Sequence, residues 1–229
     1  MSSLPAERIA VQVDPSHTVS GLLLHPANAH TCFVLAHGAG AGMEHASMSA
    51  VALDLAALGV ATLRFQFPYM ERGSKRPDPP PLCHATVRAA VAAATKLAPG
   101  LPLIAGGRSF GGRMTSQAQA LEPLPGVRGL AFLAFPLHPA GKPSDERAQH
   151  LSNVAIPMLF VQGTRDELAS LELLEPVIER LGTRAHLKLL QQADHSFHVP
   201  ARSGRKDAEV RAEALQSIVD WARTLAAPR

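Results

Sequence analysis

The sequence has few cysteines and few aromatic residues. Only two of its 229 residues are cysteine, Cys32 and Cys83, and aromatic residues make up 4%. Two cysteines do not suggest the disulfide framework of a small secreted protein, and Cys32 falls in an apolar stretch typical of a core strand. With so few aromatics there is no interleaved stacking platform for nucleic acid. We therefore expect a reducing, cytoplasmic location and no nucleic-acid partner.

Long apolar runs are also missing, since none approaches the roughly 18 residues that a membrane-spanning helix needs. The opening MSSLPAER lacks the basic-then-apolar profile of a secretory signal. The formal net charge is +3, but the basic residues are scattered, with modest clusters only at 72–76 and 202–206. This pattern indicates a solvated basic surface. We expect no membrane partner, and the oligomeric state stays open.

The size and the alternation of apolar runs predict one α/β domain over residues 1–229, of which 46% are apolar and 18% charged. Short apolar runs predict strands at residues 9–13, 20–24, 31–36, 61–67, 101–106, 127–134, 157–162 and 186–190. Longer alanine- and leucine-rich runs predict helices at residues 46–58, 84–97, 110–121, 168–181 and 206–225. The first two strands form a pair without a helix between them. We therefore expect a mostly parallel, twisted sheet of about eight strands, with an antiparallel start and helices on both faces.

The segment GRSFG at residues 107–111 carries the strongest functional signal. It lies between a predicted strand and a predicted helix, which is the context of a G-x-S-x-G nucleophile elbow. In such an elbow a strained backbone lifts the serine hydroxyl clear of the sheet, and the flanking glycines let the turn form without a clash. Ser109 is therefore the candidate nucleophile.

A serine hydroxyl needs a general base, which is usually a histidine oriented by a carboxylate. In the elbow fold the order along the chain is serine, acid, histidine, with each at the carboxyl end of a strand. Asp166 and His195 follow the strands 157–162 and 186–190 in that order. Glu167 and His198 remain alternatives for the acid and the base. Asp166 can instead cap the helix that is predicted to begin at residue 168.

A glycine-rich loop, HGAGAG at residues 37–42, follows the strand 31–36. Such a loop lets backbone N–H groups face a developing oxyanion, and the N–H of the residue after the nucleophile supplies a second donor. The candidate donors are the backbone amides of Ala39 and Phe110. Nucleotide-binding loops do not fit, because Met43 replaces the third glycine of a dinucleotide loop and Gly112 the lysine of a phosphate loop.

Two proline-rich stretches, residues 67–82 and 135–143, follow predicted strands. They should lie at the carboxyl edge of the sheet, where open α/β folds place their sites. We expect them to form the rim of a substrate pocket. The histidines show no convincing metal-ligand spacing, so no metal and no cofactor are expected.

The four components in this order resemble an α/β hydrolase. The resemblance is closer to the dienelactone-hydrolase-like branch, which includes homologues of testis-expressed protein 30 and of a subunit of a chromatin acetyltransferase complex. Residues 37–42, 63–69, 106–113, 135–139, 160–166 and 193–197 carry it. The resemblance implies an α/β-hydrolase core without a large cap domain and a triad of Ser109, Asp166 and His195. Dienelactone hydrolases use a cysteine as nucleophile, whereas the elbow residue here is serine.

These features predict a serine hydrolase that acts on a small carboxylic ester or related acyl compound through an acyl-enzyme intermediate. Two alternatives stay open at this point. One is a binding or scaffold protein that keeps the fold without catalysis, since some members of the resembling branch serve as complex subunits with no established catalysis. The other is an acyltransferase that uses the same triad. The sequence does not identify the substrate.

Overall fold

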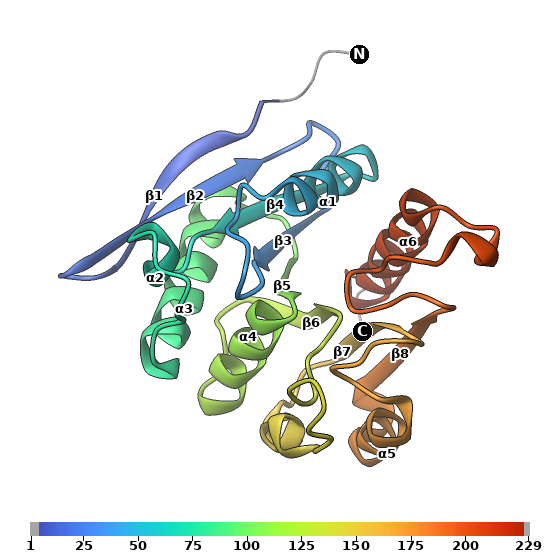
Figure 1. Ribbon diagram of the computed structural model, residues 1–229. Coiled ribbons are helices and arrows are strands. Elements are labelled where there is room, and N and C mark those ends of the chain that lie inside the picture. The colour runs from blue at the N-terminus through green and yellow to red at the C-terminus, as the bar shows by residue number, and fades with distance from the viewer. Residues whose placement is uncertain (1–4, 227–229) are drawn as a thin grey trace.

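The computed structural model describes residues 5–226. Residues 1–4, which begin the segment without a signal profile, and residues 227–229 lie outside the described residues. The centre of the fold is an eight-stranded sheet with the order β1-β2-β4-β3-β5-β6-β7-β8 (Figure 1). The strands are β1 (Glu7–Asp14), β2 (His17–Leu24), β3 (Thr31–Ala36), β4 (Val60–Phe65), β5 (Leu103–Arg108), β6 (Val127–Leu133), β7 (Met158–Gly163) and β8 (Ala185–Leu190). Strand β2 is antiparallel to β1 and β4, and the other neighbouring pairs are parallel.

Helices cover both faces of this sheet (Figure 1). The α-helices are α1 (Ala46–Ala57), α2 (Pro68–Glu71), α3 (Pro80–Leu97), α4 (Phe110–Leu121), α5 (Leu171–Leu181) and α6 (Asp207–Ala226), and the 3₁₀ helices are η1 (Glu146–Asn153), η2 (Gly182–Arg184) and η3 (Ala201–Ser203). Helix α1 packs against α6 on one face, while α3 packs against α4 on the other. The predicted α/β class with a mostly parallel sheet and an antiparallel start is confirmed, and no cap domain is evident within residues 5–226.

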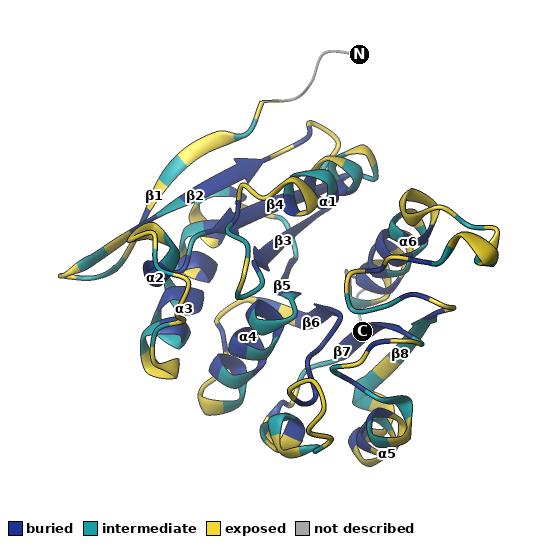
Figure 2. Ribbon diagram, viewed as in Figure 1, coloured by how far each residue is buried: buried dark blue, intermediate teal, exposed yellow. Residues whose placement is uncertain are grey.

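The central strands are buried on both sides, as parallel strands between two helix layers must be (Figure 2). Successive side chains of β3 alternate between two apolar clusters. Cys32 and Val34 join the cluster beneath α3 and α4, whereas Phe33 and Leu35 join the one beneath α1 and α6. Each helix layer therefore has its own core, and the sheet between them is held rigid.

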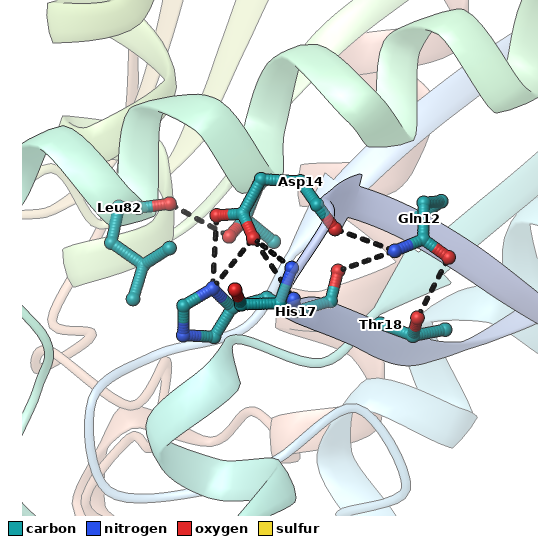
Figure 3. A network of polar contacts seen from close by, with 7 residues as sticks. Gln12, Asp14, His17, Thr18 and Leu82 are labelled. Atoms are coloured by element: carbon teal, nitrogen blue, oxygen red, sulfur yellow. Dashed lines mark hydrogen bonds and ion pairs between the residues drawn. The ribbon is translucent and has the colours of Figure 1, made fainter.

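The antiparallel start is a hairpin whose turn is closed by Asp14 (Figure 3). Its carboxylate accepts hydrogen bonds from the backbone N–H of Ser16 and from both the backbone and the ring of His17. An aspartate that bonds to the backbone two residues ahead is a common way to form a tight turn. The hairpin extends the sheet on the side away from β8.

Several predicted boundaries were wrong. Helix α3 begins at Pro80 rather than at residue 84, because prolines are well tolerated in the first turn of a helix. Strand β4 ends at Phe65 rather than at residue 67, and α2 follows in what was predicted as a proline-rich loop. Helix α5 begins at Leu171 rather than at residue 168, since the preceding residues form a turn.

The strand order reverses at β3, and this reversal positions the candidate site. The chain passes from β3 through α1 to β4 on one side, and then returns to place β5 on the other side of β3. The loops after β3 and β5 therefore leave the sheet in opposite directions and open a crevice between them, where open α/β sheets bind ligands. No helix within residues 5–226 combines the length and apolar character that crossing a membrane requires.

Candidate active site

Ser109 occupies a sharp turn between β5 and α4. Its backbone has φ 49° and ψ −118°, a conformation that residues other than glycine seldom adopt. A Cβ on Gly107 would lie 2.3 Å from the carbonyl oxygen of Ala36. A Cβ on Gly111 would lie 2.5 Å from the carbonyl oxygen of His37. The two glycines therefore let β5 and α4 approach β3 closely enough to form the turn.

Asp166 lies just after β7 and its side chain is fully buried. One carboxylate oxygen, Oδ1, accepts a hydrogen bond from the backbone N–H of Leu168 at 2.8 Å. The other, Oδ2, accepts one from the side-chain amide of Gln162, the residue next to the end of β7. These donors hold the carboxylate in one orientation.

His195 lies on the segment that joins β8 to α6. The carboxylate of Asp194 accepts hydrogen bonds from the backbone N–H groups of Ser196 and His198, at 2.7 and 2.9 Å, and so shapes the turn that presents the imidazole. Arg108, which directly precedes Ser109, also contacts this turn. Its guanidinium donates to the carbonyl oxygen of His195 at 2.9 Å and stacks over the ring of Phe197 at 5.3 Å.

The three predicted side chains meet at the carboxyl edge of the sheet, although they come from distant parts of the chain. Nδ1 of His195 lies 2.8 Å from Oδ2 of Asp166. Nε2 of His195 lies 2.8 Å from Oγ of Ser109. Because the carboxylate only accepts, the imidazole proton belongs on Nδ1, which leaves Nε2 free to accept the serine proton. This is the arrangement in which a histidine can act as general base toward a serine.

The alternatives for acid and base lie outside this chain of contacts. Glu167 is exposed and makes no hydrogen bond within residues 5–226. The ring of His198 is also exposed, and its Nδ1 pairs with Asp207 at 2.9 Å. Neither side chain contacts Ser109, so the geometry favours Asp166 and His195 for the two roles.

The glycine-rich loop after β3 lies beside the elbow and is held by its neighbours. The hydroxyl of Tyr69 donates to the carbonyl oxygen of Ala39 at 3.0 Å, and the side-chain oxygen of Gln66 accepts from the backbone N–H of Met43 at 2.9 Å. Within residues 5–226 the backbone N–H groups of Ala39 and Phe110 donate to no protein atom. Both lie on the wall of the cavity that contains Ser109, as an oxyanion site requires.

A buried histidine at the start of this loop has a structural role that was not predicted from the sequence. His37 lies at the end of β3, where its Nδ1 faces the carbonyl oxygen of Gly38 at 2.7 Å and its Nε2 accepts from the backbone N–H of Phe67 at 3.1 Å. Burial lowers the pKa of His37 to about 4, so the ring is neutral at pH 7. The neutral ring ties the glycine-rich loop to the start of α2.

Two cavities adjoin the candidate triad, one lined by Ser109 and the other by His195, and Leu168 lines both of them. The cavity beside His195 has a volume of about 410 Å³ and is lined by Arg165, Glu167, Asp194 and His198. The cavity beside Ser109 has a volume of about 430 Å³. Its wall includes Pro77, Asp78 and Pro80 from the first proline-rich stretch and Pro136 from the second. Both stretches thus border the cavity.

Three arginines at this site were also missed by the sequence analysis. Arg113 and Arg147 line the cavity beside Ser109, and Arg108 holds the turn of His195. Arg113 follows Ser109 by four residues on a helix, so helical periodicity predicts that it faces the same side. Arg147 lies in η1, and no sequence signal links that segment to the site.

In the part of the chain that the structure describes, no group of three or more histidine, cysteine, aspartate or glutamate side chains is placed to hold a metal ion.

Comparison with solved structures shows the same fold in bacterial proteins of low sequence identity. An α/β serine hydrolase homologue from Coxiella burnetii is similar, with a TM-score of 0.75 and 20% identity, covering 95% of this chain and 99% of that one. Dienelactone hydrolase from Anabaena variabilis gives a TM-score of 0.74 and 22% identity, covering 96% and 95%. A member of the α/β serine hydrolases without lid from Xanthomonas campestris gives a TM-score of 0.73 and 21% identity, covering 98% of this chain and 97% of that one.

The sequence also matches a family model described as "Alpha/beta hydrolase domain" over residues 29–223. This match begins just before β3 and ends within α6. It includes the glycine-rich loop, the elbow and the segments of Asp166 and His195. The chain therefore belongs to the α/β hydrolase domain family.

Proposed function

We propose that this protein is a serine hydrolase that cleaves small carboxylic esters or related acyl compounds. The observation that carries the proposal is the pair of 2.8 Å contacts that link Ser109 to His195 and His195 to Asp166. The family membership and the esterases and serine hydrolases among similar structures support hydrolase chemistry in general. We further propose that the chain belongs to the branch that resembles testis-expressed protein 30.

In the proposed reaction, Oγ of Ser109 attacks the ester carbonyl while Nε2 of His195 takes the hydroxyl proton. Asp166 holds the Nδ1–H tautomer and stabilises the imidazolium that forms. The backbone N–H groups of Ala39 and Phe110 donate hydrogen bonds to the tetrahedral oxyanion. These hydrogen bonds strengthen as negative charge develops on the oxygen. Collapse of this tetrahedral intermediate breaks the ester bond and leaves the acyl group on Ser109. His195 gives its proton to the departing alcohol.

The second half of the proposed reaction removes the acyl group and returns the enzyme to its starting state. Water loses a proton to Nε2 of His195 and attacks the acyl carbon on Ser109. Collapse of this second tetrahedral intermediate breaks the bond to Oγ, which recovers its proton from His195. The products are one carboxylic acid and one alcohol for each ester and water consumed.

Labelling with a fluorophosphonate probe tests the proposal, because the probe reacts with an activated serine. We expect labelling of the wild-type protein at Ser109, confirmed by peptide mapping, and loss of both labelling and esterase activity in Ser109→Ala. Ser116→Ala is a suitable control, since Ser116 lies on the same helix but bonds to His150. An unlabelled wild-type protein, or equal labelling of Ser109→Ala, would refute the proposal.

A further inference from the structure

We propose that the acyl group of the substrate carries a carboxylate, which Arg113 and Arg147 bind in the cavity beside Ser109. This inference rests on the proposed serine hydrolase function and names its substrate class. Both arginines line the same cavity of about 430 Å³ as Ser109, Ala39 and Phe110. A cavity of this size accommodates a small ester.

The guanidinium groups of Arg113 and Arg147 are unpaired within residues 5–226. Neither makes a side-chain hydrogen bond or an ion pair there, and Nε of Arg113 is buried without a partner. Two other guanidinium groups near the sheet have partners at their terminal nitrogens: Arg64 donates to the carbonyl of Met43 and Arg108 to that of His195. Nε of Arg64 is, like that of Arg113, buried without a partner, so the contrast lies in the terminal nitrogens. A buried donor without an acceptor is costly unless a ligand supplies the acceptor.

The two guanidinium groups also lie close enough to repel each other. Burial lowers the pKa of Arg113, and the charge of Arg147 lowers it further. The ring of Phe110 lies 5.8 Å from the guanidinium of Arg113. This cation–π contact offsets only part of the free-energy cost of burying the two charges close together. A bound carboxylate would satisfy the free donors and relieve the repulsion, and arginine is suited to carboxylates because its planar fork can bind both oxygens.

No acid in the cavity wall is available to neutralise the arginines. Asp78 lines the cavity, but Oδ1 pairs with Arg72 and Oδ2 accepts from the backbone N–H of Tyr69 at 2.6 Å. The thiol of Cys83 is close enough to feel the charge of Arg113, which lowers the pKa of the thiol. Burial has the larger effect and raises this pKa to about 12, so the thiol is protonated and carries no charge. The cavity beside Ser109 is therefore positively charged.

The position of His195 assigns the carboxylate to the acyl half of the ester. The leaving alcohol must receive its proton from Nε2 of His195, so it departs on the side of the second cavity, which Glu167 and Asp194 border. The acyl group then extends to the other side of Ser109, toward Arg113 and Arg147. The cavity beside His195 has one arginine, Arg165, beside two acids, whereas the cavity beside Ser109 has the two arginines that lack partners within residues 5–226. This difference in charge favours an ester whose carboxylate lies in its acyl chain.

The test compares two esters that share a leaving group and differ in one charge: the mono-4-nitrophenyl ester of adipic acid and its methyl 4-nitrophenyl diester. In wild-type protein we expect kcat/KM to be at least about tenfold higher for the charged ester. Arg113→Gln and Arg147→Gln should each reduce this ratio by about fivefold or more, and Arg113→Lys should reduce it less. Arg223→Gln, an exposed arginine on α6, should leave the ratio unchanged.

Equal kcat/KM for the two esters, or a ratio that Arg113→Gln and Arg147→Gln leave unchanged, would overturn the inference while the hydrolase proposal stands. Absence of fluorophosphonate labelling in the wild-type protein would instead count against the hydrolase proposal itself. A binding measurement tests the carboxylate site separately from the hydrolase proposal, because it needs no turnover. By calorimetry, Ser109→Ala should bind monomethyl adipate at least about tenfold more tightly than dimethyl adipate, and equal or absent binding of both would overturn the inference.

Discussion

Arg108 donates a hydrogen bond to the carbonyl oxygen of His195 at 2.9 Å, across a separation of 87 residues in the chain. Arg108 is also the last residue of β5 and directly precedes Ser109. The strand that ends at the candidate nucleophile therefore also holds the segment that carries the candidate base. Stacking of the guanidinium over Phe197, whose φ is 63°, reinforces this contact. One side chain therefore links the strand before Ser109 to the turn of His195, in addition to the contacts of Asp166 and Asp194.

We expect Arg108→Met to lower kcat/KM for esters by about tenfold or more, since a small displacement of a general base lowers the rate strongly. Arg108→Lys should recover part of the loss, because an ammonium can donate to the carbonyl of His195 but stacks less well on Phe197. Steady-state kinetics of both variants check this, and urea unfolding reports on stability. A lower free energy of unfolding with unchanged kcat/KM in Arg108→Met would show that the residue is only structural.

Asp166→Asn should lower kcat by about 10⁴-fold, because an amide no longer favours the Nδ1–H tautomer of His195 or stabilises its charged form. The neighbouring carboxylate provides a matched control. Glu167→Gln removes an exposed charge one residue away and should change kcat by less than about threefold. If Glu167→Gln were the more damaging change, the assignment of the acid would be wrong.

Gly111→Ala should lower the free energy of unfolding by about 1–3 kcal/mol, since the added Cβ would overpack against the carbonyl of His37 at 2.5 Å. Gly40→Ala is the control, because a Cβ there meets no atom within 4 Å. It should change stability by no more than about 0.5 kcal/mol. Urea unfolding of both variants at pH 7.5 measures the difference, and equal stabilities would contradict the close approach of α4 to β3.

The neutral state of His37 makes stability depend on pH. Its pKa is about 4 in the folded protein and about 6.5 in an unfolded chain. The contribution of His37 is therefore fully present above pH 6.5, and it is lost as the pH falls toward 4, because only the unfolded state takes up the proton. The total loss is up to about 3 kcal/mol.

His37→Gln isolates this contribution, because glutamine has no titrating group in this range. The difference in the free energy of unfolding between wild type and His37→Gln should decrease from pH 7.5 to pH 4.5. Urea unfolding at several pH values measures it. A difference that is constant with pH would mean that His37 is not held neutral by burial.

Local signals in the sequence were sufficient to predict most of the fold. Apolar strand runs at fixed positions, such as residues 31–36, match the observed β3 without change. The order of Ser109, Asp166 and His195 along the chain, with Asp166 and His195 after strands, brought the three to one edge of the sheet, because parallel strands end on the same side. The elbow glycines reported the close approach of two backbones, a constraint that only glycine satisfies.

Features that depend on contacts between distant segments could not be predicted. The start of α5 is one of them: Asp166 accepts from the backbone of Leu168, and the turn that results delays the helix to Leu171. Arg147 is another, because its place beside Ser109 depends on how η1 packs against α4. His37 looked like any other histidine in the sequence, and only its burial under Phe67 shows its role.

The absence of a cap domain within residues 5–226 bears on the fate of an acylated Ser109. Under the proposed function, water must reach the acyl group on Ser109 in the second half of the reaction. Here the cavities beside Ser109 and His195 are bordered by loops and helix ends, and no separate domain closes over them. Under the proposed function, water would compete with any alcohol or thiol for the acyl group on Ser109. Deacylation by the proposed route therefore requires no opening of a separate domain within residues 5–226.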